Sequence, residues 1–180
     1  MRVRPSRWLL VPFLLVAIPV LSHGQSHAIG LDFSPKAVGL SFTFASKDVA
    51  AFGVLSVSAD LQGLLDSSAQ LPGVSLRFSR ERWISWWEVA PDTRLGLYAG
   101  VGIMGGYLRD LDNIYGWTLA LSGNTGTDME FLDRRLSIGM EFSIDFGLDA
   151  RPGAKGGTVR LYRAGIVRSL MPGIKLMWRF

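Results

Sequence analysis

Cysteine is absent from this chain of 180 residues, and histidine occurs only at His23 and His27. The first absence excludes disulfide bonds and a lipid-anchored N-terminal cysteine. With so little histidine, a Ser-His catalytic pair or a His-rich metal site is hard to build. Charged residues are also few, 19% against 48% apolar, which argues against a disordered chain. We therefore predict a folded protein with no catalytic residues, no metal and no cofactor.

Long apolar runs are also missing after the N-terminus, so no helix is expected to span a bilayer, which takes about 18 residues. The apolar run at 8–21 is shorter, follows three arginines and precedes small residues, as in a secretory signal. We predict that residues 1–24 are a cleaved signal peptide; a buried N-terminal helix is the alternative. The candidate cleavage positions are Gly24, which fits best, Ser26 and Ala28.

Excess charge is missing from the remainder, 25–180, which we predict to be one domain. Three of the 19 basic residues and none of the 15 acidic residues lie in 1–24, which leaves 16 basic residues against 15 acidic ones. A net charge of +1 gives no reason to expect a nucleic-acid partner.

What the domain does have is a period of two between apolar and small or polar residues. In 137–147, for example, Ile138, Phe142 and Phe146 share one face, while Glu141 lies on the other. This period predicts strands with one face in each medium. An alternative with ten strands makes 83–89 a separate crossing. The eight predicted strands lie near 36–46, 52–61, 73–80, 93–105, 114–122, 135–147, 157–164 and 173–180.

The composition of the two faces distinguishes a membrane barrel from a soluble one. The apolar face carries large aromatics, whereas the other face is mostly Gly, Ser, Thr and Ala with isolated charges. A soluble barrel of lipocalin type, the alternative, would expose many more charges. We predict an all-β fold, an eight-stranded antiparallel up-and-down transmembrane barrel that is closed because unpaired backbone groups are costly in hydrocarbon.

Aromatic residues near predicted strand ends support a membrane position, since such rings favour the interface with water. The predicted interfacial aromatics are Trp83, Trp86, Trp87, Tyr115 and Trp117.

The last strand alternates apolar and basic residues and ends on an aromatic one, with Gly173, Leu176, Trp178 and the terminal Phe180. This end is similar to the signal that the barrel-assembly machinery reads in outer-membrane barrels of Gram-negative bacteria. Together with the signal peptide and the length, it makes the chain resemble the small OmpA/OmpX-type barrels. The resemblance implies a monomer in bacterial outer-membrane lipid. We expect the strand of Phe180 to close the barrel by pairing with 36–46.

Isolated charges on the polar faces are predicted to form ion pairs inside the barrel, because lone buried ions are costly. We expect Glu141 and Asp145 to meet Arg160, with the basic side chains of the last strand nearby. The interpretation is a structural plug, with a substrate or ion path as the alternative. The predicted network contains Arg77, Arg94, Glu141, Asp145, Arg160, Lys175 and Arg179.

A hairpin within 73–108 has a short connection and arms longer than a bilayer crossing requires. It is a candidate to project outside the cell and to bind an extracellular protein through residues 81–93. The alternative is an aromatic girdle with an ordinary loop.

These observations predict a non-enzymatic outer-membrane barrel with a structural or adhesive role through its surface loops. The alternatives are a porin-like transport or ligand-binding barrel that uses its inner face and, less favoured, an enzyme that modifies lipid A.

Overall fold

The computed structural model describes residues 25–34, 37–46, 51–60, 70–110, 115–153, 156–162, 166 and 172–180. The predicted signal peptide lies outside these residues. The strands are β1 (Gln25–Ser34), β2 (Ala37–Ser46), β3 (Ala51–Asp60), β4 (Gln70–Ala90), β5 (Thr93–Asp110), β6 (Tyr115–Phe131), β7 (Leu136–Gly153), β8 (Gly156–Leu161) and β9 (Gly173–Arg179).

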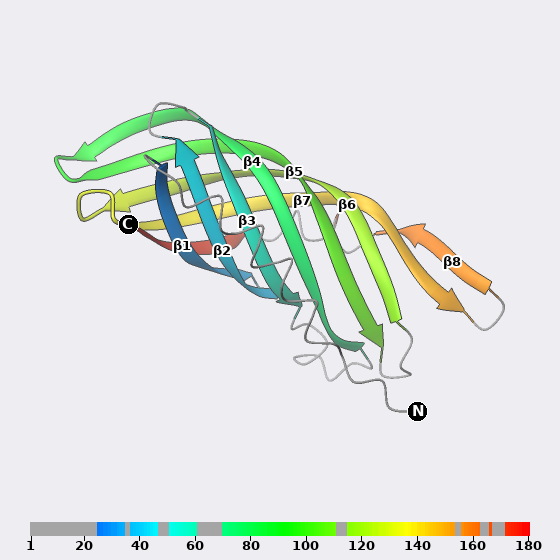
Figure 1. The fold of residues 1–180 in the computed structure, drawn as a ribbon. Helices are drawn as coiled ribbons and strands as arrows, with labels where there is room; N and C mark the ends of the chain where they lie inside the picture. The colour runs from blue at the N-terminus through cyan, green and yellow to red at the C-terminus, as the bar shows by residue number, and fades with distance from the viewer. Residues whose placement is uncertain are drawn as a thin grey trace.

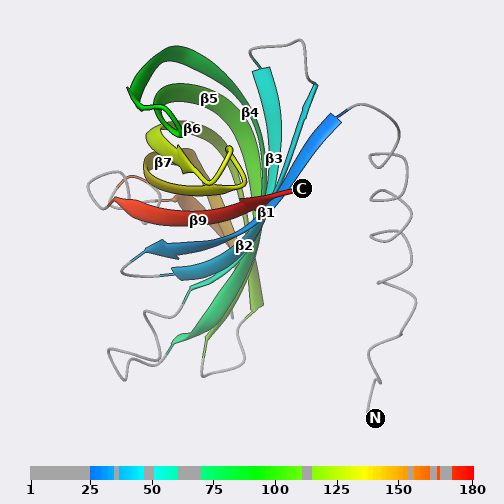
Figure 2. The same ribbon diagram turned by 90° about the vertical axis from the view of Figure 1, so that its left-hand side faces the viewer.

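The strands form a closed antiparallel barrel. Strands β1 to β7 pair in chain order, and β9 pairs with both β7 and β1 to complete a ring of eight strands. Figure 2 shows β9 between β7 and the β1–β2 hairpin. The predicted eight-stranded up-and-down barrel is therefore confirmed. Among the described residues, no helix is long and apolar enough to cross a membrane.

The register fixes the tilt of the strands. A path that follows Cα partners from strand to strand around the ring starts on β7 at Leu136. It returns to β7 at Phe146, ten residues further along. A stagger of ten residues over eight strands tilts them by about 40° from the barrel axis. The path passes through Leu136, Trp178, Ile29, Phe42, Leu55, Phe78, Ile103, Leu121 and Phe146.

Strands β8 and β9 pair with two different stretches of β7. Strand β8 pairs with Leu148–Gly153, whereas β9 pairs with Leu136–Glu141, and both run antiparallel to β7. In Figure 1, β8 lies at the end of the barrel away from the C-terminus. The two segments thus follow one another along the same side of β7, and only β9 closes the ring.

This arrangement corrects three sequence-based assignments. The predicted strands 157–164 and 173–180 share one position beside β7, while β1, which the prediction omitted, takes the remaining position. The closing partner of β9 is therefore β1 and not 36–46. The ten-stranded alternative is wrong, because 83–89 continues β4.

The alternation along the strands separates two faces, as predicted. Large apolar side chains such as Ile29, Leu40, Ile103 and Phe146 are exposed on the outside. Buried polar side chains such as Ser41 and many charged ones point inward. The apolar face therefore forms the outer surface of the barrel, and the polar face lines its lumen. This arrangement is typical of a barrel in lipid.

Candidate functional site in the barrel lumen

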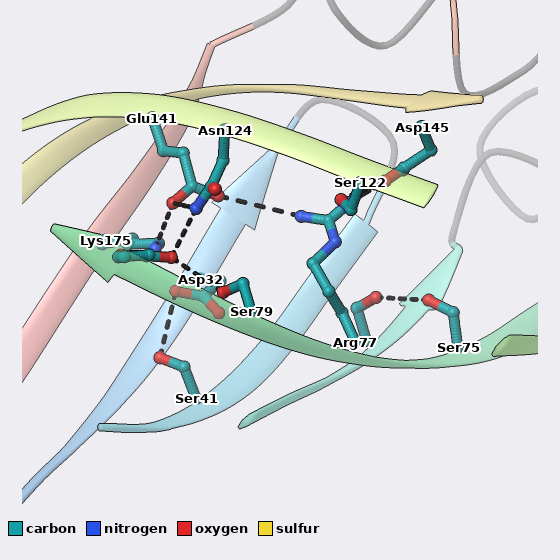
Figure 3. Close-up of polar contacts among 12 residues, drawn as sticks. Asp32, Ser41, Ser75, Arg77, Ser79, Ser122, Asn124, Glu141, Asp145 and Lys175 are labelled. Carbon is teal, nitrogen blue, oxygen red and sulfur yellow. Dashed lines mark hydrogen bonds and ion pairs between the residues drawn. The ribbon is translucent and has the colours of Figure 1, made fainter. Parts of the chain in front are cut away.

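The middle of the lumen holds an ion cluster that joins β4, β7 and β9 (Figure 3). The Arg77 guanidinium donates to both carboxylate oxygens of Asp145, at 2.7 and 3.0 Å, and lies 3.8 Å from Glu141. The ammonium group of Lys175 donates to Glu141. Asp145 is completely buried. Since Glu141 contacts both cations, the two ion pairs form one unit.

Neutral donors extend this cluster toward β5 and β6. Glu81 is only 1% exposed and accepts hydrogen bonds from the Ser79 hydroxyl, at 2.9 Å, and from the Asn124 amide. The Tyr98 hydroxyl donates to Glu141 at 3.0 Å. The carboxylates of the cluster are thus held by donors from neighbouring strands, as buried charges require.

Acids outnumber bases in this cluster. On β1, Asp32 accepts a hydrogen bond from the Ser41 hydroxyl at 3.2 Å and lines the same interior space. Two cations therefore have to balance four carboxylates, and the network depends strongly on both. The carboxylates are Asp32, Glu81, Glu141 and Asp145, and the cations are Arg77 and Lys175.

A cavity of about 100 Å³ adjoins the cluster and extends toward the β1–β2 turn. Its lining includes Asp32, Arg77 and Lys175 at one side and Ser34 and Ala37 at the turn. A cavity of this size, with a lining of both polar and apolar side chains, has room for a few water molecules. It is smaller than the roughly 300–1,000 Å³ of sites for drug-sized ligands.

The other part of the lumen, near the C-terminus, holds a group of aromatic rings beside a smaller cavity of about 40 Å³. The ring centroid of Trp83 lies 4.9 Å from Phe52, 4.0 Å from Trp86 and 5.4 Å from Tyr98. The guanidinium of Arg94 lies 3.6 Å from the centroid of Trp86. These side chains form the aromatic layer, a second and chemically different filling of the barrel.

Glycines on the inner face make room for these large side chains. A Cβ at Gly96 would lie 2.5 Å from the Trp86 ring and 2.7 Å from the Trp83 ring. A Cβ at Gly126 would lie 2.5 Å from the Tyr98 hydroxyl oxygen. These glycines thus leave space on the inner face for the rings of neighbouring strands.

A β-bulge explains why the predicted interfacial role of Trp83 and Trp86 is wrong. Trp83 faces Tyr98 and Trp86 faces Gly96 across the β4–β5 ladder, with Ile84 as the extra residue between them. One inserted residue shifts the alternation, so both tryptophans point inward although they are three positions apart. Period-two reasoning has no means to place this insertion.

The other predicted interfacial aromatics are distributed differently. Trp87 and Trp117 are 48% and 57% exposed, as residues on the outer surface are. The side chain of Tyr115 lies outside the described residues. An interfacial position of these three residues stays a prediction.

Most of the predicted lumen charges do meet inside the barrel. Besides the ion cluster, Arg179 contacts Glu130 at 2.8 Å, and Arg94 lies 3.7 Å from the same carboxylate. Arg160 is the exception, because it is exposed on β8 and forms no ion pair with the described residues. Glu141 and Asp145 therefore meet Arg77 and not the expected Arg160.

The sequence reasoning missed several acids that face the lumen. Asp32 belongs to the omitted strand β1, Glu81 lies one residue beyond the predicted strand 73–80, and Glu130 lies between the predicted strands 114–122 and 135–147. A signal was present, since the inner face continues as every second residue through Arg77, Ser79 and Glu81. Extending the alternation of 73–80 by one residue would have found Glu81.

The residues of the predicted assembly signal lie on β9 and at its end. Leu176, Trp178 and Phe180 are exposed on the outer face, and Gly173 begins the strand. The Phe180 amide donates to the His27 carbonyl at 3.0 Å. Recognition by the barrel-assembly machinery stays a prediction.

Of the described residues, the one histidine, His27, takes no part in the lumen. The His27 ring stacks on Phe42 with a centroid distance of 5.6 Å, on the outer side of β1 and β2. Within the described ranges, no group of three or more His, Asp or Glu side chains is arranged to hold a metal ion.

No protein-family model matches this chain. No curated protein matches it either. Among solved structures, it is similar to the N-terminal β-barrel domain of OprF from Pseudomonas aeruginosa, at 12% identity over 87% of this chain and 96% of that domain, with a TM-score of 0.48. It is also similar to a major outer membrane protein from Thermus thermophilus, at 13% identity over 88% of this chain and all of that one, with a TM-score of 0.46.

The chain's own strand pairing and polarity define it as a membrane β-barrel of the outer-membrane type. Its closed ring of eight strands is consistent with the predicted resemblance to OmpA/OmpX-type barrels. The lipid-facing apolar belt is likewise consistent with the predicted location in the bacterial outer membrane.

Proposed function

We propose that this outer-membrane barrel is a structural, non-enzymatic protein with a sealed lumen. The observation that carries the proposal is the double filling of the interior. The ion cluster occupies the middle, and the aromatic layer occupies the end near the C-terminus. An ion crossing the barrel would have to displace buried charge pairs and then closely packed rings, both of which are costly.

Conductance in planar bilayers tests this proposal. The refolded barrel is expected to give almost no current, while an open porin in the same bilayers shows that the measurement works. A stable conductance from wild-type barrel would contradict the sealed lumen. Comparing lipid A mass spectra from deletion and complemented cells tests the non-enzymatic part, and no change is expected.

A ligand-binding barrel is the second candidate, because the 100 Å³ cavity is lined by charged and hydroxyl groups. Its size favours water or a very small solute over an organic ligand. The sealed structural barrel therefore remains the better supported function.

The orientation follows from the lengths of the connections. The end that carries Phe180 has connections of two to four residues, at 47–50, 91–92 and 132–135. The opposite end includes the longer connections 61–69 and 162–172. Since outer-membrane barrels have short periplasmic turns and longer extracellular loops, we place Phe180 on the periplasmic side.

This orientation revises the predicted partner site at 81–93. The tip of the β4–β5 hairpin lies at the same end as the C-terminus (Figure 1). A protein partner of this hairpin would therefore be periplasmic. An adhesive role would instead use 61–69 and 162–172, and cell-binding assays with each segment shortened would test it.

A further inference from the structure

Two arginines interrupt the apolar outer face of β4. Val74 and Phe78 are 51% and 45% exposed on this face, and Arg80 and Arg82 continue it toward the end that carries Phe180. Both arginines are exposed. The residue between them, Glu81, points into the lumen, so both guanidinium groups belong to the outer surface. We call these two arginines the basic patch.

The partners of the basic patch across the two ladders are uncharged. Arg80 pairs with Gly53 on β3 and Val101 on β5. Arg82 pairs with Ala51 and Ala99 on the same two strands. The ring of Phe44 lies over Gly53 on one side of Arg80, whereas Arg82 lies between two alanines. No described carboxylate forms an ion pair with Arg80 or Arg82.

The energetic cost of a lipid-facing arginine locates the basic patch. An arginine on the outside of a barrel costs roughly 2–4 kcal/mol at the bilayer midplane and about 0–1 kcal/mol near the interface. The outer face of β6 is also less apolar near this end, where Thr125 and Thr127 are exposed. The same end on the opposite side is aromatic, with His27 6.3 Å from Phe180 between ring centroids. The basic patch therefore lies where headgroups begin.

We propose that Arg80 and Arg82 bind the phosphate group of an anionic phospholipid in the leaflet at the Phe180 end. Residues two apart on a strand are about 7 Å apart, which lets two guanidinium groups approach one phosphate from both sides. Arginine suits this role because its planar fork donates two hydrogen bonds to a phosphate. The charge is complementary, since two cations without a described partner face an anionic headgroup.

Native mass spectrometry of the folded barrel in detergent tests this site. Wild-type protein is titrated with phosphatidylglycerol and with phosphatidylcholine that has the same acyl chains. Each basic residue near an anionic surface contributes about fivefold to affinity, so the variant R80Q/R82Q should bind phosphatidylglycerol roughly 25-fold more weakly. Binding of phosphatidylcholine should hardly change.

The matched control is R134Q/R135Q, which removes two exposed arginines from the β6–β7 turn at the same end. This control should retain phosphatidylglycerol as the wild type does. Equal losses in the two variants would overturn the proposal, because the effect would then be one of net charge. Displacement of the lipid by an equal concentration of inorganic phosphate would also overturn it, since the site would then be one for free phosphate.

Folding is checked on a gel that compares boiled and unboiled samples. If R80Q/R82Q fails to fold, R80K/R82K replaces it, because lysine keeps the charge and loses the bidentate geometry. An intermediate affinity for phosphatidylglycerol is expected for this variant. Affinity below that of R134Q/R135Q supports the site, and affinity equal to the wild type counts against arginine-specific binding.

Discussion

The two fillings of the lumen are held by different forces. In the ion cluster, Lys175 pairs with Glu141, and Arg77 is shared between Glu141 and Asp145. In the aromatic layer, Trp83 is held by ring contacts and by the space that Gly96 leaves. Tyr98 belongs to both, because its hydroxyl donates to Glu141 and its ring packs against Trp83.

This contrast means that the two regions should fail differently. A buried charge network loses much when one partner is removed, because the remaining charges stay in a medium of low dielectric constant. A packed aromatic layer loses contact area in proportion to the atoms that are deleted. Substitutions in the two regions should therefore differ in size and in how they can be rescued.

The largest effect is expected for Lys175→Met. Breaking a buried ion pair by removing one partner costs about 3–5 kcal/mol, and Lys175 is the cation closest to Glu141. Urea titration of the barrel in lipid vesicles measures the free energy of unfolding. Adding Glu141→Gln to the variant should recover part of the loss, because one uncompensated carboxylate is then gone. A loss under about 1 kcal/mol would mean that the cluster is not held by pairing.

The next largest effect is expected for Trp83→Ala. A fully buried tryptophan loses about 3–5 kcal/mol on truncation to alanine, and the partly buried Trp83 should lose about 2–3 kcal/mol of unfolding free energy. A second substitution that removes a charge should not recover this loss, in contrast to the rescue of Lys175→Met by Glu141→Gln. Trp87→Ala is the matched control on the outer surface, where about 0.5 kcal/mol is expected. Equal losses at the two positions in urea titrations would contradict an inward Trp83.

Period-two alternation was enough to predict the class of fold, and the reason is physical. Each crossing strand must place apolar residues in lipid and polar residues inside, so the pattern survives in every strand of the ring. The count of eight came out right through two offsetting errors, the omission of β1 and the separation of β8 from β9. Strand β1 has the same alternation, but its start adjoins the predicted signal peptide.

The lumen was predictable in composition and only partly in pairing. Arg77, Glu141, Asp145 and Lys175 were expected inside and are found there. Their partners depend on the stagger of the barrel, which sets the strands that face one another and which alternation alone does not give. The bulge at Ile84 is likewise a local insertion, so the inward position of Trp86 could not be derived from spacing.

A smaller effect is expected when the space beside the tryptophans is filled. Gly96→Val would force its side chain against rings that lie 2.5 and 2.7 Å from a Cβ at this position. Overpacking costs about 1–3 kcal/mol, so the free energy of unfolding should fall by roughly this amount. Near-ultraviolet circular dichroism reports whether the rings of Trp83 and Trp86 shift. Gly105→Val is the control, because nothing lies within 4 Å of a Cβ there, and a loss as large as at Gly96 would contradict the packing argument.

The smallest effect is expected for Arg94→Gln, at the border of the aromatic layer. The guanidinium lies over Trp86 at 3.6 Å and 3.7 Å from Glu130, but Glu130 keeps Arg179 at 2.8 Å. Cation–π pairs at partly exposed sites contribute about 0.5–1 kcal/mol, so a loss of about 1 kcal/mol is expected. A double-mutant cycle with Trp86→Ala isolates the pair, and the coupling should be about 0.5–1 kcal/mol. If the losses of the two single variants simply add, Arg94 acts through Glu130 alone. Arg94 would then belong to the ion pairs of the lumen and not to the aromatic layer.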